Sequence, residues 1–123
     1  MAVDLVSARL LVLDAGTASL RAAVFDGTGH LLGSATAQWP YVEAEDPLLM
    51  REFDPDRTWA AMAGAARRAL READVAPEAV VAIAAASQRD GCVLLDEEGQ
   101  ELACTLNRDA RGVVYADEIA SDF

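Results

Sequence analysis

Residues 10–21 have the sequence LLVLDAGTASLR, in which an apolar run ends at an acid and leads into a short polar loop. Such a run, bounded by turn residues, is typical of a strand, and it would place the carboxylate of Asp14 at the strand's end. A carboxylate in that position can hold Mg²⁺, usually through water molecules. Gly16 would let the backbone turn and approach a ligand closely. The stretch therefore predicts a strand that presents an acid beside a tight turn.

The polar residues of this turn suit a nucleotide phosphate. The hydroxyls of Thr17 and Ser19 and the backbone N–H groups around them can face phosphate oxygens, and Arg21 adds positive charge. A Walker loop is excluded, because no Gly-Lys-Ser/Thr follows and the next element, residues 19–25, has the pattern of a strand. The alternative is an ordinary β-turn whose polar residues occur by chance.

The hydrophobic pattern predicts an α/β domain with the element order β-β-β-α-β and an inserted hairpin. The predicted strands are alternating or continuous apolar segments, and they span residues 9–13, 19–25, 30–39, 80–86, 92–96 and 101–106. One helix is predicted from Pro55 to about Ala73, because Asp54 can cap its first turn and proline suits the first helical position. A surface loop is expected over residues 41–50, and a second helix could begin after Arg111.

Three groups of residues carry expectations about burial. The predicted helix has an apolar stripe that is expected to enter the core, made of Trp59, Met62, Ala63, Ala66 and Leu70. The strand at residues 80–86 is apolar throughout, which is typical of a central parallel strand buried on both faces. Cys92 and Cys104 lack the spacing of metal ligands and are expected as small buried residues in a reducing cytoplasm.

Composition bounds the class of protein. The chain has 123 residues, 53% of them hydrophobic and 25% charged, which suits one domain with its own core and excludes a disordered chain. A formal net charge of −11 argues against nucleic acid or an anionic membrane as a partner. The first residues lack the basic and apolar regions of a signal peptide, and no apolar run could span a bilayer. A cytoplasmic protein is therefore expected, and its oligomeric state stays open.

Two further polar clusters follow predicted strands. Gln88, Arg89 and Asp90 come directly after the strand at residues 80–86, and ligands of open α/β sheets bind outside such strand ends. Their amide, guanidinium and carboxylate groups suit a polyhydroxylated molecule, although a solvated loop is the alternative. Residues 107–111 form either a second wall of the same pocket or a cluster of ion pairs at a helix start.

Two other polar residues have simpler interpretations. His30 is the one histidine of the chain and is expected at the surface, so no Ser/His/Asp or Cys/His set for hydrolysis can be assembled. Glu52 could reach a pocket, but a surface acid is the simpler expectation.

In combination, these segments resemble the N-terminal lobe of the FGGY carbohydrate kinases. The matching segments follow the order and spacing of that family between about Leu10 and Gly112, and they are residues 14–21, 52–55 with Trp59, 87–91, 94–99 and 107–111. The resemblance implies a ribonuclease-H-like lobe of the actin, Hsp70 and sugar-kinase superfamily over residues 8–123, with residues 1–7 as a short extension. It also implies that the lobe is truncated at its C-terminal end.

For the nucleotide, the resemblance implies ATP and Mg²⁺ as cofactors. Asp14 would help to position Mg²⁺. Gly16, Thr17 and Ser19 would lie along the nucleotide phosphates, and Arg21 would lie near the transferred phosphoryl group. The adenine pocket and the catalytic base belong to a second lobe in this family, so no residue of this chain is assigned as the base.

For the substrate, the resemblance implies a small sugar, polyol or related molecule. Gln88, Arg89 and Asp90 would bind its hydroxyl groups, and Asp109 and Arg111, which match the family's Asp-x-Arg step, would contribute to the same site. The likeness is greatest to a branch of the family that phosphorylates a short dihydroxy-dione.

One position departs from the common pattern of the family. Many members carry tryptophan where this chain has Asn107, which implies a more polar pocket. Two alternatives to a kinase lobe stay open at the level of sequence: a sugar-binding module without catalysis, and a gene fragment without activity of its own.

Overall fold

The computed structural model describes residues 6–43, 45, 46 and 48–122. Along the chain, the elements are β1 (Arg9–Ala15), β2 (Leu20–Asp26), β3 (Leu31–Ala37), α1 (Pro55–Glu72), a 3₁₀ turn (Pro77–Ala79), β4 (Val80–Ser87), β5 (Cys92–Leu95), β6 (Glu101–Thr105), a second 3₁₀ turn (Arg111–Tyr115) and α2 (Ala116–Asp122). The predicted order is confirmed, with bounds that agree within two residues. Of the expected N-terminal extension, residues 1–5 lie outside the described residues.

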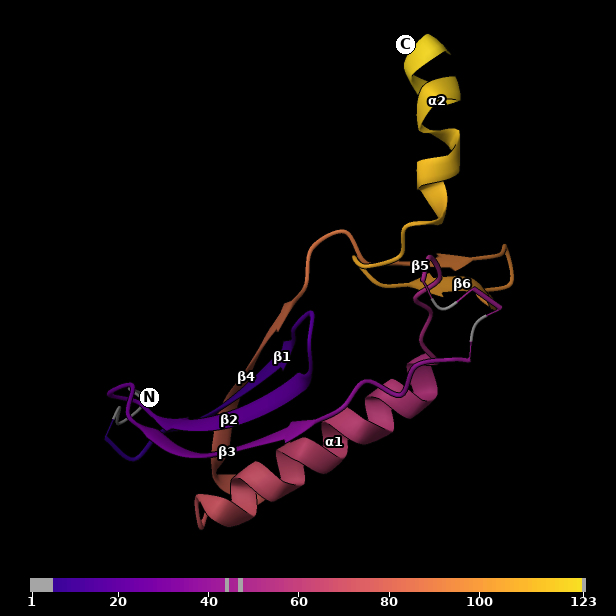
Figure 1. Cartoon of the computed structure of the whole chain (residues 1–123). Coiled ribbons are helices and arrows are strands. Elements are labelled where there is room, and N and C mark those ends of the chain that lie inside the picture. The colour runs from indigo at the N-terminus through magenta and orange to yellow at the C-terminus, as the bar shows by residue number, and fades with distance from the viewer. Residues whose placement is uncertain (1–5, 44, 47, 123) are drawn as a thin grey trace.

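Strands β1–β4 form one mixed sheet in the order β3-β2-β1-β4 (Figure 1). β1 and β2 are antiparallel, in a register that runs from Arg9 opposite Asp26 to Ala15 opposite Leu20. β3 joins β2 in antiparallel orientation, and β4 joins the other side of β1 in parallel. A parallel neighbour needs a crossover connection, which α1 supplies. Because β1 and β4 run in parallel, the β1–β2 turn and the end of β4 lie at the same edge of the sheet.

Helix α1 covers the face of the sheet formed by β2 and β3 (Figure 1). Its start follows from the sequence, since Asp54 accepts a hydrogen bond of 2.9 Å from the backbone N–H of Arg57 and Pro55 occupies the first turn. The core between helix and sheet is made of Leu11, Ala22, Val24, Ala65, Ala69 and Leu70. Small residues bring the two layers close together: at Gly33 of β3, a Cβ atom would lie only 2.6 Å from the backbone nitrogen of Ala73.

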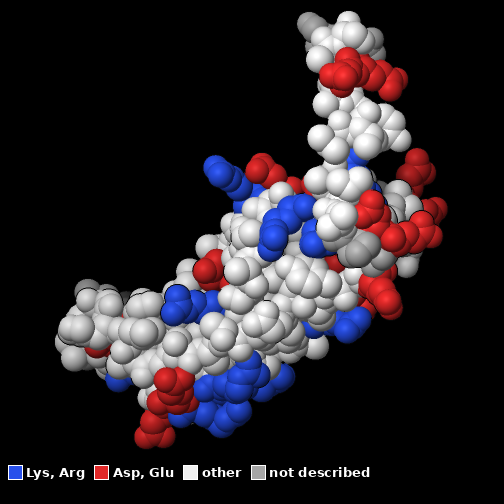
Figure 2. Space-filling view, in the orientation of Figure 1, with Lys and Arg blue, Asp and Glu red and all other residues white. Residues whose placement is uncertain are grey.

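The outer face of α1 is strongly basic. Four of the ten basic residues of the chain lie on this helix, namely Arg57, Arg67, Arg68 and Arg71. Figure 2 shows the contrast on one face of the molecule, with blue arginines gathered over α1 and red acids around the β5–β6 end. Consistent with such polar surfaces, none of the helices among the described residues combines the length and apolarity needed to cross a bilayer.

β5 and β6 form a separate antiparallel hairpin with Cys92 opposite Thr105. The hairpin is held by the segment that precedes α1. The backbone N–H of Phe53 donates to the carbonyl of Cys104 at 3.0 Å, and the N–H of Leu106 donates to the carbonyl of Arg51 at 3.0 Å. α2 extends beyond the hairpin and away from the sheet (Figure 1).

Three expectations about burial are wrong. Trp59 is 67% exposed, because the buried stripe of α1 begins only at Met62. β4 is exposed along nearly its whole length, with Ile83 at 64%, since it lies at the edge of the sheet while α1 packs on β2 and β3. Cys92 is exposed, whereas Cys104 is buried as expected. The apolar side chains of β4 thus form surfaces that the described residues leave uncovered.

Candidate functional site

The β1–β2 turn, residues 16–19, is held from two distant segments. The indole Nε1–H of Trp39 donates to the carbonyl oxygen of Gly16 at 2.8 Å, and the side-chain Nδ2–H of Asn107 donates to the hydroxyl oxygen of Thr17 at 3.0 Å. Trp39 itself is buried, and its ring meets that of Phe53 edge to face with centroids 5.5 Å apart. The turn is therefore fixed in space although Thr17 is exposed.

Asp14 and Arg21 lie opposite each other on β1 and β2. Alternate residues of a strand point to opposite faces of the sheet, and the neighbours Leu11, Ala22 and Val24 point toward α1. The carboxylate and the guanidinium therefore share the other face. There they line a cavity of about 220 Å³ with apolar and hydroxyl side chains, namely Val12, Ala23, Phe25, Leu31 and Ser34. An acid and a cation side by side in an open cavity can serve a metal ion and a phosphate.

Gly16 matters for access to the Asp14 carboxylate. Its φ lies outside the left-handed region, so the turn does not depend on the backbone freedom of glycine. A Cβ atom at this position would instead lie 3.8 Å from both carboxylate oxygens of Asp14 and 3.5 Å from the carbonyl oxygen of Ser19. The missing side chain leaves that approach to the carboxylate open.

The donor set at Asp14 fits a magnesium ion that arrives with a nucleotide. Among the residues that the structure describes, no three acids, histidines or cysteines gather as a ready-made metal site. A Mg²⁺ ion at Asp14 would then take its other ligands from phosphate oxygens and water, which is how sites for Mg²⁺ with phosphate substrates are commonly built.

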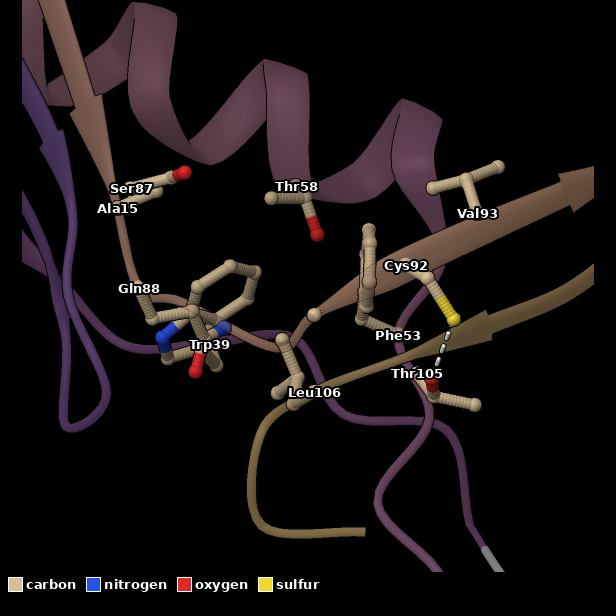
Figure 3. A pocket seen from close by; sticks show the side chains of 11 residues that line it. Ala15, Trp39, Phe53, Thr58, Ser87, Gln88, Cys92, Val93, Thr105 and Leu106 are labelled. Carbon is tan, nitrogen blue, oxygen red and sulfur yellow. Dashed lines mark hydrogen bonds between the residues drawn. The ribbon is translucent and has the colours of Figure 1, made fainter. Parts of the chain in front are cut away.

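Gln88 lies next to the β1–β2 turn. Its backbone N–H donates to the carbonyl oxygen of Ala15 at 2.9 Å. Its side chain lines a second cavity, of about 280 Å³ (Figure 3). The lining comes from α1, β4, the β5–β6 hairpin, the segment between β3 and α1 and the residue after β6, and it includes Trp39, Phe53, Thr58, Ser87, Cys92 and Leu106. The side-chain oxygens of Gln88 and Thr58 are buried, and neither has a hydrogen-bond partner within the described part of the chain. Acceptors of this kind can receive hydroxyl donors from a ligand.

Arg89 and Asp90 do not line this cavity. Their side chains are 92% and 79% exposed, and only a 4.0 Å ion pair joins them. Asp90 has a φ of 62°, a left-handed conformation that aspartate tolerates better than most residues. The turn over these two residues directs the chain from β4 into the hairpin, with both charges in solvent.

Asp109 and Arg111 form a cluster with Glu52, which is the ion-pair alternative left open by the sequence. The guanidinium of Arg111 contacts an oxygen of Glu52 at 2.7 Å and both oxygens of Asp109 at 3.0 and 2.9 Å. Asp109 also accepts a hydrogen bond of 2.9 Å from the backbone N–H of Arg51. The cluster therefore ties the segment before α1 to the segment after β6.

The charges of this cluster are mutually stabilised. Burial by itself raises the pKa of Asp109, but hydrogen bonds from the Arg111 guanidinium and from backbone N–H groups outweigh burial and hold that pKa below its usual value. The pKa of Arg111 is raised, chiefly by the hydrogen bond to Asp109, while burial opposes and Glu52 adds to the increase. Both groups are charged at neutral pH.

The structure thus brings some of the predicted site residues together and separates others. Asp14 and Arg21 share one cavity beside the β1–β2 turn, and Gln88 lies next to that turn. Arg89 and Asp90 point into solvent, and Asp109 and Arg111 are engaged with Glu52.

The contacts made by Trp39, Glu52 and Asn107 were not predicted. Trp39 shows no periodic pattern that would mark it as a support of the turn. The partner of Glu52 lies 59 positions away, a pairing that charge alone cannot identify. The one signal in the sequence that could have drawn attention to Asn107 was that many family members carry tryptophan at this position.

Comparisons with known proteins identify the family and the fold. The family model described as "FGGY family of carbohydrate kinases, N-terminal domain" matches residues 9–122. Autoinducer-2 kinase of Escherichia coli (strain K12) is 36% identical over 110 residues, which cover 89% of this chain and 21% of the relative. Autoinducer-2 kinase of Yersinia enterocolitica is 37% identical over 102 residues, with 83% and 19% covered.

Solved structures show the same fold. A "xyloylose kinase" from Brucella ovis superposes with a TM-score of 0.74 at 30% identity, over 93% of this chain and 23% of that one. Plasmodium falciparum glycerol kinase with ADP has a TM-score of 0.71 at 15% identity, over 94% and 23%, a likeness of fold alone. The expected lobe of the actin, Hsp70 and sugar-kinase superfamily is therefore confirmed.

The chain spans about a fifth of the length of the curated relatives that it matches. Within that span, the family model covers nearly every described residue, and strand order, helix position and the β1–β2 turn follow the pattern expected of that lobe. The chain therefore belongs to the FGGY family of carbohydrate kinases, and its residues 9–122 match the N-terminal domain of that family.

Proposed function

We propose that residues 8–123 belong to the first lobe of an ATP-dependent carbohydrate kinase, which transfers the γ-phosphoryl group of ATP to a hydroxyl group of a small substrate. The observation that carries this proposal is the pairing of Asp14 with Arg21 on the open face of the sheet, beside a fixed turn that bears Thr17 and Ser19. Phosphoryl transfer depends mostly on positioning and on charge stabilisation, and this arrangement supplies both.

On the nucleotide side, each residue has a separate task. Bound Mg²⁺ would neutralise phosphate charge, and Asp14 would hold it through the oxygen-rich contacts that this ion prefers. The turn would donate backbone N–H groups and the hydroxyls of Thr17 and Ser19 to phosphate oxygens. Arg21 would stabilise the negative charge that spreads over the transferred group.

On the substrate side, Gln88 is the residue best placed to bind. Its buried amide oxygen lies in the 280 Å³ cavity next to the β1–β2 turn. Arg89 and Asp90 are exposed at the same strand end and could close over a substrate that enters from solvent. Because the relatives named above are autoinducer-2 kinases, a short dihydroxy-dione such as autoinducer-2 is the first candidate substrate, and other sugars and polyols follow.

The remaining parts of the site would come from a second lobe. The whole protein would act in the cytoplasm. Support for a partner lobe comes from the uncovered apolar surface of β4 and from a gap of about 380 Å³ between β4 and α1, lined by Leu13, Trp59, Met62 and Ala85 among others. The adenine pocket and the base that removes the hydroxyl proton would lie on that lobe. The 123-residue chain by itself is expected to show negligible turnover.

The test has two stages. Titration of the chain with magnesium ATP, followed by NMR, should shift the amide signals of residues 14–21 before those of α2. A gene product that carries this domain together with a second lobe should then consume ATP when offered a panel of diones, ketoses and polyols.

Variants assign the roles. Arg21→Ala should lower kcat/KM by about 10²-fold or more, since it removes charge stabilisation of the transferred group. Arg67→Ala, which removes an exposed arginine from the outer face of α1, is the matched control and should leave turnover unchanged. Equal activities of the two variants would remove Arg21 from the mechanism, and amide shifts confined to other regions would remove the β1–β2 turn.

A further inference from the structure

We propose that Asn107 is a positioning residue for the β1–β2 turn. It takes no part in the chemistry but holds the hydroxyl of Thr17 so that the hydroxyl proton points outward. The Glu52–Arg111–Asp109 cluster in turn holds Asn107 in place. This role rests on the proposed function, in which the turn binds nucleotide phosphates. The observation behind it is a side-chain hydrogen bond of 3.0 Å between residues 90 positions apart in sequence.

The first step concerns the turn itself. Thr17 is exposed at the tip, where a four-residue connection between strands would otherwise move freely. The bond from Trp39 fixes the carbonyl of Gly16, and the bond from Asn107 fixes the side chain of Thr17. Fixing a loop before a ligand arrives improves affinity, because less conformational freedom is lost on binding.

The second step concerns the direction of the proton. A threonine hydroxyl can donate one hydrogen bond and accept two. The amide of Asn107 donates to the oxygen of Thr17, so the lone pair on that side is occupied and the O–H is free to donate elsewhere. A phosphate oxygen can only accept, and it needs such a donor. Asn107 thus prepares Thr17 as a donor without touching the nucleotide.

The third step concerns the support of Asn107. Its neighbour Leu106 is 3% exposed, and the backbone N–H of Leu106 donates to the carbonyl of Arg51 at 3.0 Å. On the other side, Asp109 closes a turn by donating its N–H to the carbonyl of Leu106 at 2.9 Å. The carboxylate of Asp109 is clamped by Arg111, which also binds Glu52. Asn107 is therefore anchored at both ends.

The same contact connects the two halves of the proposed site. Residues 107–111 follow Leu106, which lines the cavity that contains Gln88 together with Thr105 of β6. The β1–β2 turn is the proposed nucleotide site. A rearrangement of the wall on the substrate side would therefore reach the nucleotide side through the Asn107–Thr17 contact, in addition to the contact of Trp39 with Gly16.

The experiment measures amide hydrogen exchange of residues 16–19 in the nucleotide-free chain, and magnesium ATP affinity in parallel. Asn107→Ala and Thr17→Val should each raise exchange at the turn. Asn107→Ala should weaken magnesium ATP binding by about five- to tenfold, as expected for one lost hydrogen bond, and Thr17→Val should weaken it further, because it also removes the hydroxyl that donates to phosphate. The double variant should be no worse than Thr17→Val alone, because both changes break the same contact. Thr17→Ser, which keeps the hydroxyl, should restore most of the affinity.

A fourth single variant tests whether the Glu52–Arg111–Asp109 cluster supports Asn107. Glu52→Gln should raise exchange at the turn to a smaller extent, whereas Glu97→Gln, on the exposed β5–β6 turn, should not change it. Additive effects of Asn107→Ala and Thr17→Val, or unchanged exchange in Asn107→Ala, would overturn the role of Asn107. Failure of the proposed function looks different: magnesium ATP would then leave the wild-type turn unshifted, while the exchange measurements would still decide whether Asn107 positions it.

Discussion

The two halves of the molecule differ in how they use apolar residues. In the half formed by β1–β3 and α1, most apolar side chains are buried or half-buried, and Leu20, Val24 and Ala65 have no exposed surface. In the half formed by β4, the β5–β6 hairpin and α2, most apolar side chains are exposed, as at Ile83 and Leu102. Composition therefore does not decide burial; the presence of a covering layer does.

This difference explains why β4, the longest strand of the chain and an apolar one, is exposed at seven of its eight residues. Helix α1 runs along β2 and β3, where Gly33 lets it approach closely. β4 lies one strand beyond β1, out of reach of this layer. A strand that is apolar on both faces is adapted to two covering layers. In this chain, the described residues cover neither face of β4.

The largest effect is expected where the two layers of the packed half meet. Gly33→Ala would place a Cβ atom 2.6 Å from the nitrogen of Ala73 and 2.8 Å from the carbonyl oxygen of Ala69, both backbone atoms that cannot move aside. The free energy of unfolding should fall by about 3 kcal/mol. Gly64→Ala is the control: its Cβ would lie 3.5 Å from Arg68, so it should raise helix stability by about 1 kcal/mol. Urea denaturation of both variants gives the comparison.

A matched pair of valines tests the difference between the halves directly. Val24 has no exposed surface, whereas Val81 is 55% exposed. Val24→Ala should lower the free energy of unfolding by about 2 kcal/mol, since two buried methyl groups are lost. Val81→Ala should change it by less than about 0.5 kcal/mol, as at other surface positions. Equal losses, measured by denaturant titration of the chain, would mean that β4 is covered in solution, for example by self-association.

At the junction of the halves, the N-cap of α1 should have an intermediate effect. Asp54→Ala removes the acceptor for the N–H of Arg57 and should destabilise the chain by about 1 kcal/mol. Asp54→Asn retains an equally good cap and should be nearly neutral. Thermal unfolding followed by circular dichroism distinguishes the two. A loss of the same size in both variants would show that the negative charge matters rather than the hydrogen bond.

The smallest effect is expected at the β2–β3 turn and depends on pH. Asp26 accepts hydrogen bonds from the hydroxyl of Thr28 at 2.6 Å and from the backbone N–H of His30 at 3.0 Å, which hold its pKa well below the usual value. The stabilisation from these contacts is therefore complete above about pH 4, the ordinary carboxyl pKa, and is lost as pH falls toward the folded-state pKa.

Amide exchange at Thr28 and His30 should accordingly stay slow from pH 7 to about pH 4, after correction for intrinsic rates, and rise below that. Asp26→Asn should remove the dependence on pH in this turn and leave residues 92–105 unaffected. A rise that begins well above pH 4 would contradict the assignment to Asp26.

Most of the fold could be predicted from local patterns. The cap at Asp54, the proline after it and the Gly-containing turn at residues 26–29 determine where elements begin and end, and such signals act within a few residues. His30 was expected at the surface and lies there, although its contacts with Asp26 and Thr28 were not foreseen. The exposure of Trp59 and β4 could not be predicted, because it depends on which segments, distant in sequence, pack over them.

In the candidate site too, local features could be predicted and contacts between segments distant in sequence could not. The β1–β2 turn with Asp14 and Arg21 is a local feature, and its residues could be named from their spacing. The bonds from Trp39 and Asn107 that hold the turn join positions 23 and 90 residues apart, so no local pattern reveals them. The roles of all these residues in binding remain proposals for the experiments above.

The indole of Trp39 has an optical consequence. The chain contains two tryptophans, of which Trp39 is 7% exposed behind the β1–β2 turn and Trp59 is mostly in water. Their emission maxima should differ, with the sheltered ring shifted to the blue. Trp59→Phe would leave one tryptophan, hydrogen-bonded to Gly16, so occupancy of the turn could be followed by tryptophan emission without any added dye.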